Sequence, residues 1–104
     1  MTIRDITKED YKVIDSWYLE RNISVPALKF LPENGLGGLI LEKEKPIAAA
    51  YVYTTNSKVG YIDFLISDPN YKEEDRYDII LELFKELTQK AYDLGCEMVW
   101  AQSS

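Results

Sequence analysis

The sequence contains no histidine and only one cysteine among its 104 residues. Without histidine, the chain lacks the commonest general base and the commonest transition-metal ligand. The single thiol, Cys96, allows neither an internal disulfide nor a thiolate metal cluster. Because it lies between a helix stop and an apolar run, we interpret it as a small buried group rather than a reactive nucleophile.

Long apolar runs and an excess of positive charge are missing as well. No apolar run approaches the roughly 20 residues that span a bilayer, and the N-terminus has no signal-peptide pattern. We therefore expect a cytoplasmic protein that does not enter a membrane. The net charge of −6 disfavours binding to the phosphate backbone of nucleic acids. Lysines and arginines are interspersed with the acids, which argues against an acidic surface that mimics DNA.

The composition that remains is that of an ordinary globular domain. Hydrophobic residues make up 46% of the chain and charged residues 29%, which is typical of a folded rather than a disordered protein. A chain of this length can form a single core but not two, so we expect one domain over residues 1–104. There are no internal repeats, low-complexity tracts or linkers.

The clearest structural signal lies between Gly60 and Ala101. An apolar run at 61–66 is followed by a turn, by a long helical pattern that stops at Gly95, and by a second apolar run at 98–101. The helical pattern consists of apolar residues at helical spacing: Ile80, Leu83, Phe84, Leu87, Ala91 and Leu94. This order predicts a βαβ unit whose right-handed crossover makes its two strands parallel.

The first half of the chain predicts one helix and three strands. Residues 2–6 alternate polar and apolar, and Thr7 can cap a helix that ends near residue 21. Strands over 36–42 and 47–54 are joined by a charged turn. The second of them holds three consecutive alanines, which suggests close approach of a helix. The whole order, β-α-loop-β-β-β-α-β, predicts an α+β fold: an antiparallel meander with a βαβ crossover and helices packed on the sheet.

Residues 23–36 follow neither pattern. Pro26 and Pro32 leave room for only a turn or so of helix between them. The segment is nevertheless too apolar to be fully exposed to solvent, and we expect four of its residues to be packed against the rest of the protein: Val25, Leu28, Phe30 and Leu31. One interpretation is a loop packed over the core, and the other is a wall of a binding groove.

This order of elements, with these local sequences, resembles the GNAT superfamily of N-acetyltransferases. Residues 2–10 are similar to the family's first strand and helix start, and residues 42–50 to its second hairpin. The segment Asp-Phe-Leu-Ile-Ser-Asp-Pro-Asn-Tyr-Lys at 63–72 is similar to the fourth strand and the turn after it. The resemblance covers essentially the whole chain and rests on pattern and topology. It implies acetyl transfer from acetyl-CoA to an amine of a small molecule or a protein.

The resemblance also implies which residues would bind acetyl-CoA and catalyse. In the family, the fourth strand splays from the fifth and its backbone pairs with the pantetheine arm, here through the N–H groups of Leu65 and Ile66. On the same strand, Asp63 is the best-placed carboxylate to deprotonate the amine, directly or through water. The alternative interpretation is that Asp63 is a solvent-facing strand residue without a catalytic role. Tyrosines at 51, 53 and 61 are interpreted as core rather than catalytic.

The loop that holds the diphosphate in the family is altered in this chain. Family members wrap the diphosphate with a glycine-containing loop at a helix N-terminus. The matching residues, 72–77, keep cations at Lys72 and Arg76, but Asp75 and Tyr77 stand where glycines belong. Three carboxylates, at 73, 74 and 75, would also repel a diphosphate. We therefore expect acetyl-CoA to bind more weakly than about 100 μM, or not at all.

The end of the chain also departs from the family. Members normally continue past the fifth strand into another helix and a closing hairpin, which this sequence lacks. We therefore expect either a minimal variant, similar to compact GNAT-like proteins of phages, or a piece of a longer protein. The missing glycines and segment favour an alternative function: a catalytically inactive protein-binding or phage structural module. An uncovered edge beside Trp100 predicts a two-fold dimer that buries this residue and the C-terminal tail. The competing interpretation is a monomer whose edge is protected by the loop at 25–31.

Overall fold

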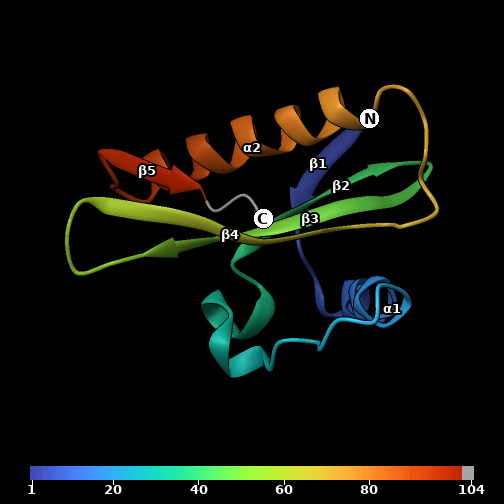
Figure 1. Ribbon diagram of the computed structural model, residues 1–104. Helices are drawn as coiled ribbons and strands as arrows, with labels where there is room; N and C mark the ends of the chain where they lie inside the picture. The colour runs from blue at the N-terminus through green and yellow to red at the C-terminus, as the bar shows by residue number, and fades with distance from the viewer. Residues whose placement is uncertain (102–104) are drawn as a thin grey trace.

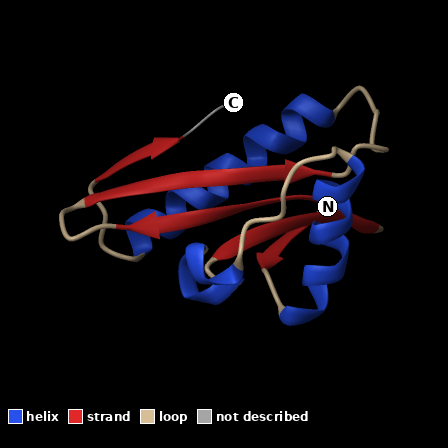
Figure 2. Cartoon of the chain, turned by 60° about the horizontal axis from the view of Figure 1, so that its bottom comes forward, coloured by secondary structure: helices blue, strands red, loops and turns tan. Residues whose placement is uncertain are grey.

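The computed structural model describes residues 1–101 and consists of a five-stranded sheet with one helix on each face (Figures 1 and 2). The elements confirm the α+β order expected from the sequence. The strands are β1 (Thr2–Asp5), β2 (Gly38–Lys43), β3 (Lys45–Thr54), β4 (Val59–Ser67) and β5 (Met98–Ala101). The helices are α1 (Tyr11–Glu20) and α2 (Arg76–Asp93), and short 3-10 turns lie at Lys8–Asp10, Leu28–Phe30 and Pro32–Gly35. In the part of the chain described, no helix is long and apolar enough to cross a membrane.

The strands lie in the sheet in their sequence order. Each of the first four pairs with the next in antiparallel fashion, and β5 pairs with β4 in parallel fashion. Helix α2 makes the crossover between these last two strands, as the βαβ pattern predicts. Gly95 ends the crossover helix with φ +101°, a conformation that residues with a Cβ avoid.

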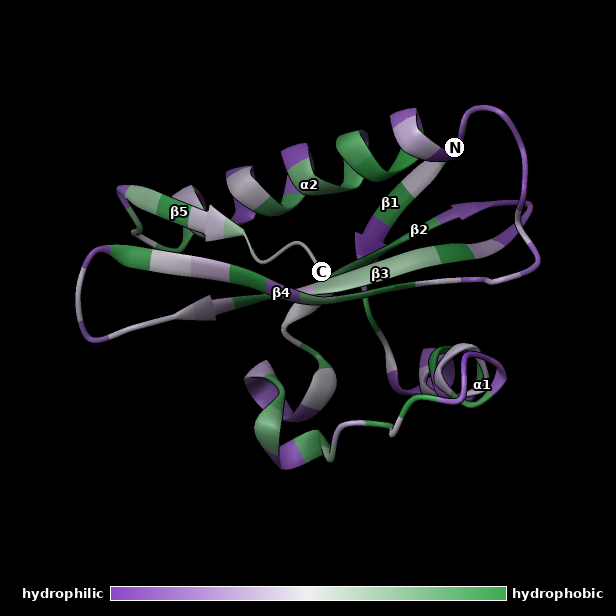
Figure 3. Ribbon diagram, viewed as in Figure 1, coloured by the Kyte–Doolittle hydropathy of each residue, from purple (hydrophilic) through white to green (hydrophobic). Residues whose placement is uncertain are grey.

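Helix α2 covers one face of the sheet. Leu83 and Leu87 are fully buried and pack against Ala48 and Ala50 of β3, so the alanine run does allow close approach of a helix. The residues predicted to be buried on this helix differ from the observed ones at both ends of the series. Ile79 is 3% exposed although the series omitted it, whereas Leu94 is 57% exposed because the helix ends one residue earlier. Figure 3 shows hydrophobic residues along the central strands below this helix.

Helix α1 covers part of the other face. Its buried residues, Ile14, Trp17 and Tyr18, pack against a cluster that includes Ile40 and Ile66. The start of the helix is fixed by the buried carboxylate of Asp10, which accepts a hydrogen bond from the Thr7 N–H at 2.7 Å. Two nitrogens of Arg4 also donate to this carboxylate, at 2.8 and 2.9 Å.

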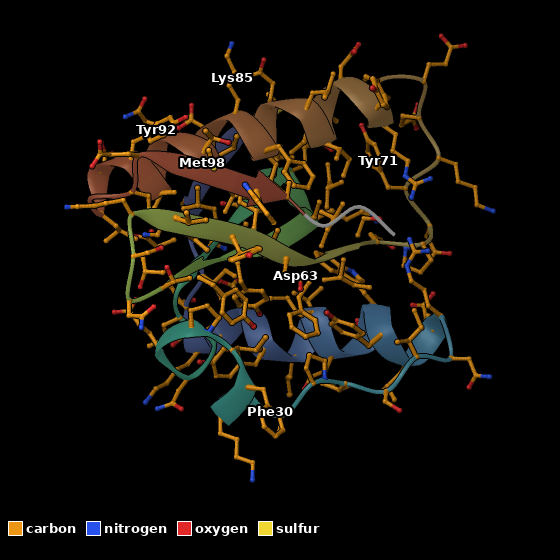
Figure 4. The ribbon with its side chains drawn as sticks, turned by 60° about the vertical axis from the view of Figure 1, so that its left-hand side comes forward. Phe30, Asp63, Tyr71, Lys85, Tyr92 and Met98 are labelled. Atoms are coloured by element: carbon orange, nitrogen blue, oxygen red, sulfur yellow. The ribbon has the colours of Figure 1, made fainter. Side chains whose placement is uncertain are left out.

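The segment between α1 and β2 is less well covered than the sequence suggested. Leu31 is buried, but Val25, Leu28 and Phe30 are 38%, 44% and 64% exposed. The expectation of cover is therefore wrong for three of the four residues: Leu28 and Phe30 lie in a short turn that has no buried residue, and Val25 precedes it. Figure 4 shows Phe30 projecting from the surface, while its carbonyl accepts a hydrogen bond from the Tyr53 hydroxyl at 2.8 Å.

Candidate active site on strand β4

Strand β4 contains a bulge at the centre of the sheet. Tyr51 of β3 lies opposite Asp63, whereas Ala49 lies opposite Ile66, so β4 has one residue more than β3 over this stretch. Within it, Phe64 has φ +56°, which is uncommon for a bulky residue. The Asp63 carboxylate accepts a hydrogen bond from the Phe64 N–H at 2.7 Å. Bulges of this kind bend a strand and re-aim its side chains, often beside active sites.

Beyond the bulge, β4 has no partner on its outer side within residues 1–101. The ladder with β5 extends only from Val59 to Ile62, although β4 continues to Ser67. The outer edge of this last part of β4 therefore presents backbone groups that the described part of β5 does not pair with. Leu65 lies in this stretch with its side chain 38% exposed, whereas the side chain of Ile66 is buried on the α1 side.

A cleft lies between the end of β4 and the beginning of α2. It has a volume of about 430 Å³ and is lined by Leu65, Ser67, Glu74, Arg76, Tyr77 and Ile80. The N–H groups of Tyr77 and Asp78 form no hydrogen bond with any residue that the structure describes. Free N–H groups, the positive end of the helix dipole and the guanidinium of Arg76 together make this cleft attractive to an anion.

The carboxylates of the preceding loop do not act together. Asp75 accepts a hydrogen bond from the Tyr71 hydroxyl at 2.6 Å and another from the Lys43 ammonium at 3.1 Å. These two bonds, the tyrosine bond first, lower the pKa of Asp75. The Lys43 ammonium offsets part of the charge of Asp75, and the expected repulsion of a diphosphate by the three carboxylates stays a prediction. Glu73 and Glu74 are exposed and have no ion pair among the described residues.

Two arginines from different helices meet at the end of β4. Arg21, just after α1, donates to the Ser67 carbonyl at 3.2 and 3.1 Å and to its hydroxyl at 3.0 Å. Arg76 approaches the same hydroxyl at 3.4 Å. Sequence reasoning identified Arg76 but missed Arg21 and Ser67, which are separated by 46 positions and carry no local motif. Lys72, the other predicted cation, is exposed and does not line the cleft.

Asp63 lies on the opposite face of β4, toward α1 (Figure 4). On the same face, the hydroxyl of Tyr18 is buried and has no hydrogen-bond partner among residues 1–101. Burial, followed by the negative charge of Asp63, raises the pKa of Tyr18 to about 12. Of the three tyrosines predicted to be core, Tyr51 is 2% exposed, but Tyr61 is 37% exposed.

The candidate residues thus form two groups on the two faces of one strand. Leu65 and Arg76 line the cleft on the α2 side, and Asp63 lies on the α1 side, the face on which Tyr18 is buried. Within residues 1–101, no three acidic or cysteine side chains come close enough to hold a metal ion. A cleft lined by Arg76 and Glu74 and the carboxylate of Asp63 thus lie on opposite sides of a bulged strand whose outer edge is partly unpaired among the described residues.

Solved structures with the same architecture bind coenzyme A. The N-acetylglutamate synthase of Neisseria gonorrhoeae, complexed with coenzyme A and N-acetyl-glutamate, matches with a TM-score of 0.76 and 19% identity over 98% of this chain and 25% of that one. Rv2747 of Mycobacterium tuberculosis, in complex with CoA, matches with a TM-score of 0.76 and 18% identity over 97% of this chain and 63% of that one. The chain therefore spans only part of the length of these two proteins.

A GNAT family acetyltransferase of Staphylococcus aureus matches over more of its own length. Its TM-score is 0.67 at 15% identity, covering 99% of this chain and 86% of that one. No protein-family model matches the sequence, and neither does any curated protein. At identities this low, the likeness concerns the fold alone. The chain has the fold of the GNAT acetyltransferases.

Proposed function

We propose that this chain transfers an acetyl group from acetyl-CoA to an amine. The observation that carries the proposal is the placement of a cleft with a guanidinium and a carboxylate on the two faces of β4, where the outer side of that strand has no partner beyond Ile62 among the described residues. In this arrangement, the backbone of Leu65 and Ile66 pairs with the pantetheine arm. Arg76 and the free N–H groups at the start of α2 bind the diphosphate.

The cleft fits a diphosphate, though without the close approach that glycines allow. Arg76 supplies a guanidinium, and Lys43 and Tyr71 engage the carboxylate of Asp75. Glu73 and Glu74 still oppose the ligand, and Lys72 contributes only at longer range. We therefore expect a dissociation constant of about 0.1 to 1 mM, which corresponds to roughly 4 to 5.5 kcal/mol of binding free energy.

Asp63 is the proposed base. Acetyl-CoA supplies an acyl group activated as a thioester, and the amine must lose a proton to become its nucleophile. One carboxylate oxygen of Asp63 accepts the Phe64 N–H, which fixes the carboxylate in place. The other oxygen has no partner in the part of the chain described and takes the proton of the ammonium. The bulge holds this carboxylate on the acceptor side of β4, away from the acidic loop at 73–75.

A second candidate function is a GNAT-fold module that binds a protein, including a phage structural role. Exposed apolar side chains favour it: Phe30 is 64% exposed, Trp100 56% and Met98 53%. The altered diphosphate loop is consistent with it too. In this case, the fold would present a surface, and neither the cleft nor Asp63 would take part in chemistry.

Acetyl transfer is tested by incubating the purified chain with acetyl-CoA and a panel of primary amines, followed by chromatography of free CoA and acetylated amine. The proposed function predicts equal amounts of the two products and their loss in Asp63→Asn. Release of CoA no faster than in protein-free buffer, with every amine in the panel, would favour the binding module.

A further inference from the structure

A second cleft lies at the opposite end of α2 from the cleft that Arg76 lines. Its volume is about 310 Å³, at the lower end of the range for small-molecule sites. The lining comes from three segments that are distant in sequence, and it includes Pro32 and Glu33 before β2, Val52 and Thr54 of β3, and Lys90 and Leu94 at the end of α2. Helix α2 and the turn at Pro32–Gly35 lie on opposite sides of the sheet (Figure 1), so a ligand in this cleft is held between them.

The edge of β3 in this cleft has unpaired backbone groups. Strand β2 begins at Gly38, so it does not accompany the last residues of β3. The Val52 N–H donates to the Gly37 carbonyl at 3.0 Å, but the Gly37 N–H donates instead to the Pro32 carbonyl, also at 3.0 Å. Thr54, two residues after Val52, presents its backbone to the same side of the strand. The Val52 carbonyl and the Thr54 N–H therefore face this edge without a partner among the described residues.

The cleft also contains one side chain of each charge. Glu33 is exposed and has no ion pair or hydrogen bond through its carboxylate in the part of the chain described. The Lys90 ammonium contacts Asp5 at 3.3 Å, but the Asp5 side chain is 72% exposed and does not line the cleft. Such surface pairs are weak, and an ammonium has three N–H donors. Both charges are thus available to a ligand.

The turn that carries Glu33 is held in an uncommon conformation. Glu33, Asn34 and Gly35 all have positive φ, at 50°, 54° and 90°, which the surrounding structure must enforce at the two residues that are not glycine. The Tyr11 hydroxyl donates to the Asn34 carbonyl at 2.8 Å. A Cβ at Gly35 would approach the Tyr11 ring to 3.2 Å. Because this turn is already ordered, binding a ligand at Glu33 costs little further freedom.

We infer that this cleft binds a free α-amino acid with an aliphatic side chain. The ammonium of the amino acid donates to the Glu33 carboxylate and the Val52 carbonyl. Its carboxylate accepts from the Lys90 ammonium and the Thr54 N–H. Three apolar side chains contact its aliphatic group: Pro32, Val52 and Leu94. The site shares no lining residue with the coenzyme cleft, so the inference goes beyond the proposed function and does not rest on it.

The test is a titration of the full chain with L-leucine at pH 7, followed by the NMR signal of the Thr54 amide in protein labelled with ¹⁵N-threonine. That signal is assigned by its loss in Thr54→Ser. We expect it to move downfield, because the N–H donates to a carboxylate. Glu33→Gln and Lys90→Met should each weaken leucine about tenfold, since each removes a hydrogen bond between charged groups. Glu82→Gln and Lys85→Met, which remove the same charges from the exposed side of α2, should not.

Two derivatives separate a free amino acid from the end of a peptide. Leucinamide keeps only the ammonium, as the first residue of a peptide does, and N-acetyl-leucine keeps only the carboxylate, as the last residue does. Each should bind at least about tenfold more weakly than leucine. Glycine keeps both charges but lacks the aliphatic group, and it should also bind about tenfold more weakly.

Asp5→Asn separates the role of Lys90 in the cleft from its surface ion pair. This variant removes the pair and leaves the cleft intact, so it should bind leucine at least as tightly as the wild type. The inference is overturned if about 20 mM leucine leaves the Thr54 signal in place, or if glycine or either derivative binds as tightly as leucine. It is overturned equally if Glu33→Gln or Lys90→Met matches the wild type, or if Asp5→Asn weakens leucine tenfold. Because the titration contains no coenzyme, failure of acetyl transfer leaves this result unaffected.

Discussion

Replacing Arg4 by methionine tests the ion pair that anchors α1, the helix that carries Tyr18. Arg4 donates to both oxygens of Asp10, at 2.8 and 2.9 Å, and the Asp10 side chain is only 7% exposed. Removing one partner of a buried pair typically costs 3–5 kcal/mol, because it leaves a charge without compensation. Arg4 is itself 34% exposed, and the Thr7 N–H still bonds the carboxylate. We therefore expect a loss of about 2 to 3 kcal/mol in the free energy of unfolding.

Urea unfolding at pH 7, followed by circular dichroism, measures this loss. With a slope of about 1 kcal/mol per molar urea for a small domain, the midpoint should fall by about 2 to 3 M. Glu42→Gln is the matched control: it weakens the second, more exposed contact of Arg4, at 3.0 Å, and should cost less than about 1 kcal/mol. Equal losses in the two variants, or a loss below about 0.5 kcal/mol in Arg4→Met, would refute the reasoning.

The same pair makes a prediction about pH. Hydrogen bonding to Arg4 is the largest cause that lowers the pKa of Asp10 below its ordinary 3.8. A lowered pKa in the folded state adds stability that is complete above the ordinary value and is lost as the pH falls through the lower one. The difference in stability between the wild type and Arg4→Met should therefore be constant from about pH 7 to pH 5 and shrink below about pH 4. A difference that stayed constant down to pH 2 would rule out Asp10 as its source.

Three further predictions concern catalysis, the core and assembly. Asp63→Asn should lower turnover about 100-fold or more while leaving the affinity for acetyl-CoA unchanged, as measured by steady-state kinetics and calorimetry; unchanged turnover would remove Asp63 from the mechanism. Leu83→Ala, at a residue of α2 that is 0% exposed, should lower the free energy of unfolding by about 2 to 5 kcal/mol, as measured with urea, and a loss under about 1 kcal/mol would contradict the packing described. We also propose that exposed Trp100 and the edge of β5 form a two-fold dimer, which light scattering would reveal; a monomer of 12.0 kDa at micromolar concentration would exclude it.

The order of the elements could be predicted because each one is encoded locally. Helical spacing, strand alternation and the stop at Gly95 depend on neighbouring residues, and together they sufficed for the βαβ unit and the fold. The buried face of α2 was harder to define at its ends: Ile79 continues the i, i+4 series of buried residues 83, 87 and 91, whereas Leu94 follows the last helical residue and is exposed. The bulge at Phe64 left no sequence signal, because a positive φ is normally marked by glycine or asparagine.

The candidate residues Leu65 and Arg76 came from the resemblance to the GNAT family, and Asp63 from its place on the strand that the resemblance singled out; their roles stay predictions. The contacts that modify the site join residues far apart in sequence, such as Lys43 with Asp75 and Arg21 with Ser67, separated by 32 and 46 positions. The final tail, which the sequence placed in a dimer interface, lies outside the described residues, so that part of the expectation stays a prediction.

The most direct test of the central claim is a calorimetric titration of acetyl-CoA into the wild type, Arg76→Glu and Lys85→Glu. Both variants reverse one positive charge on α2, but Arg76 lines the cleft, whereas Lys85 is exposed away from the sheet (Figure 4). We predict a dissociation constant of about 0.1 to 1 mM for the wild type and Lys85→Glu, and binding at least tenfold weaker for Arg76→Glu. Equal weakening in both variants, or no heat from the wild type at millimolar acetyl-CoA, would contradict the assignment of the cleft to the coenzyme.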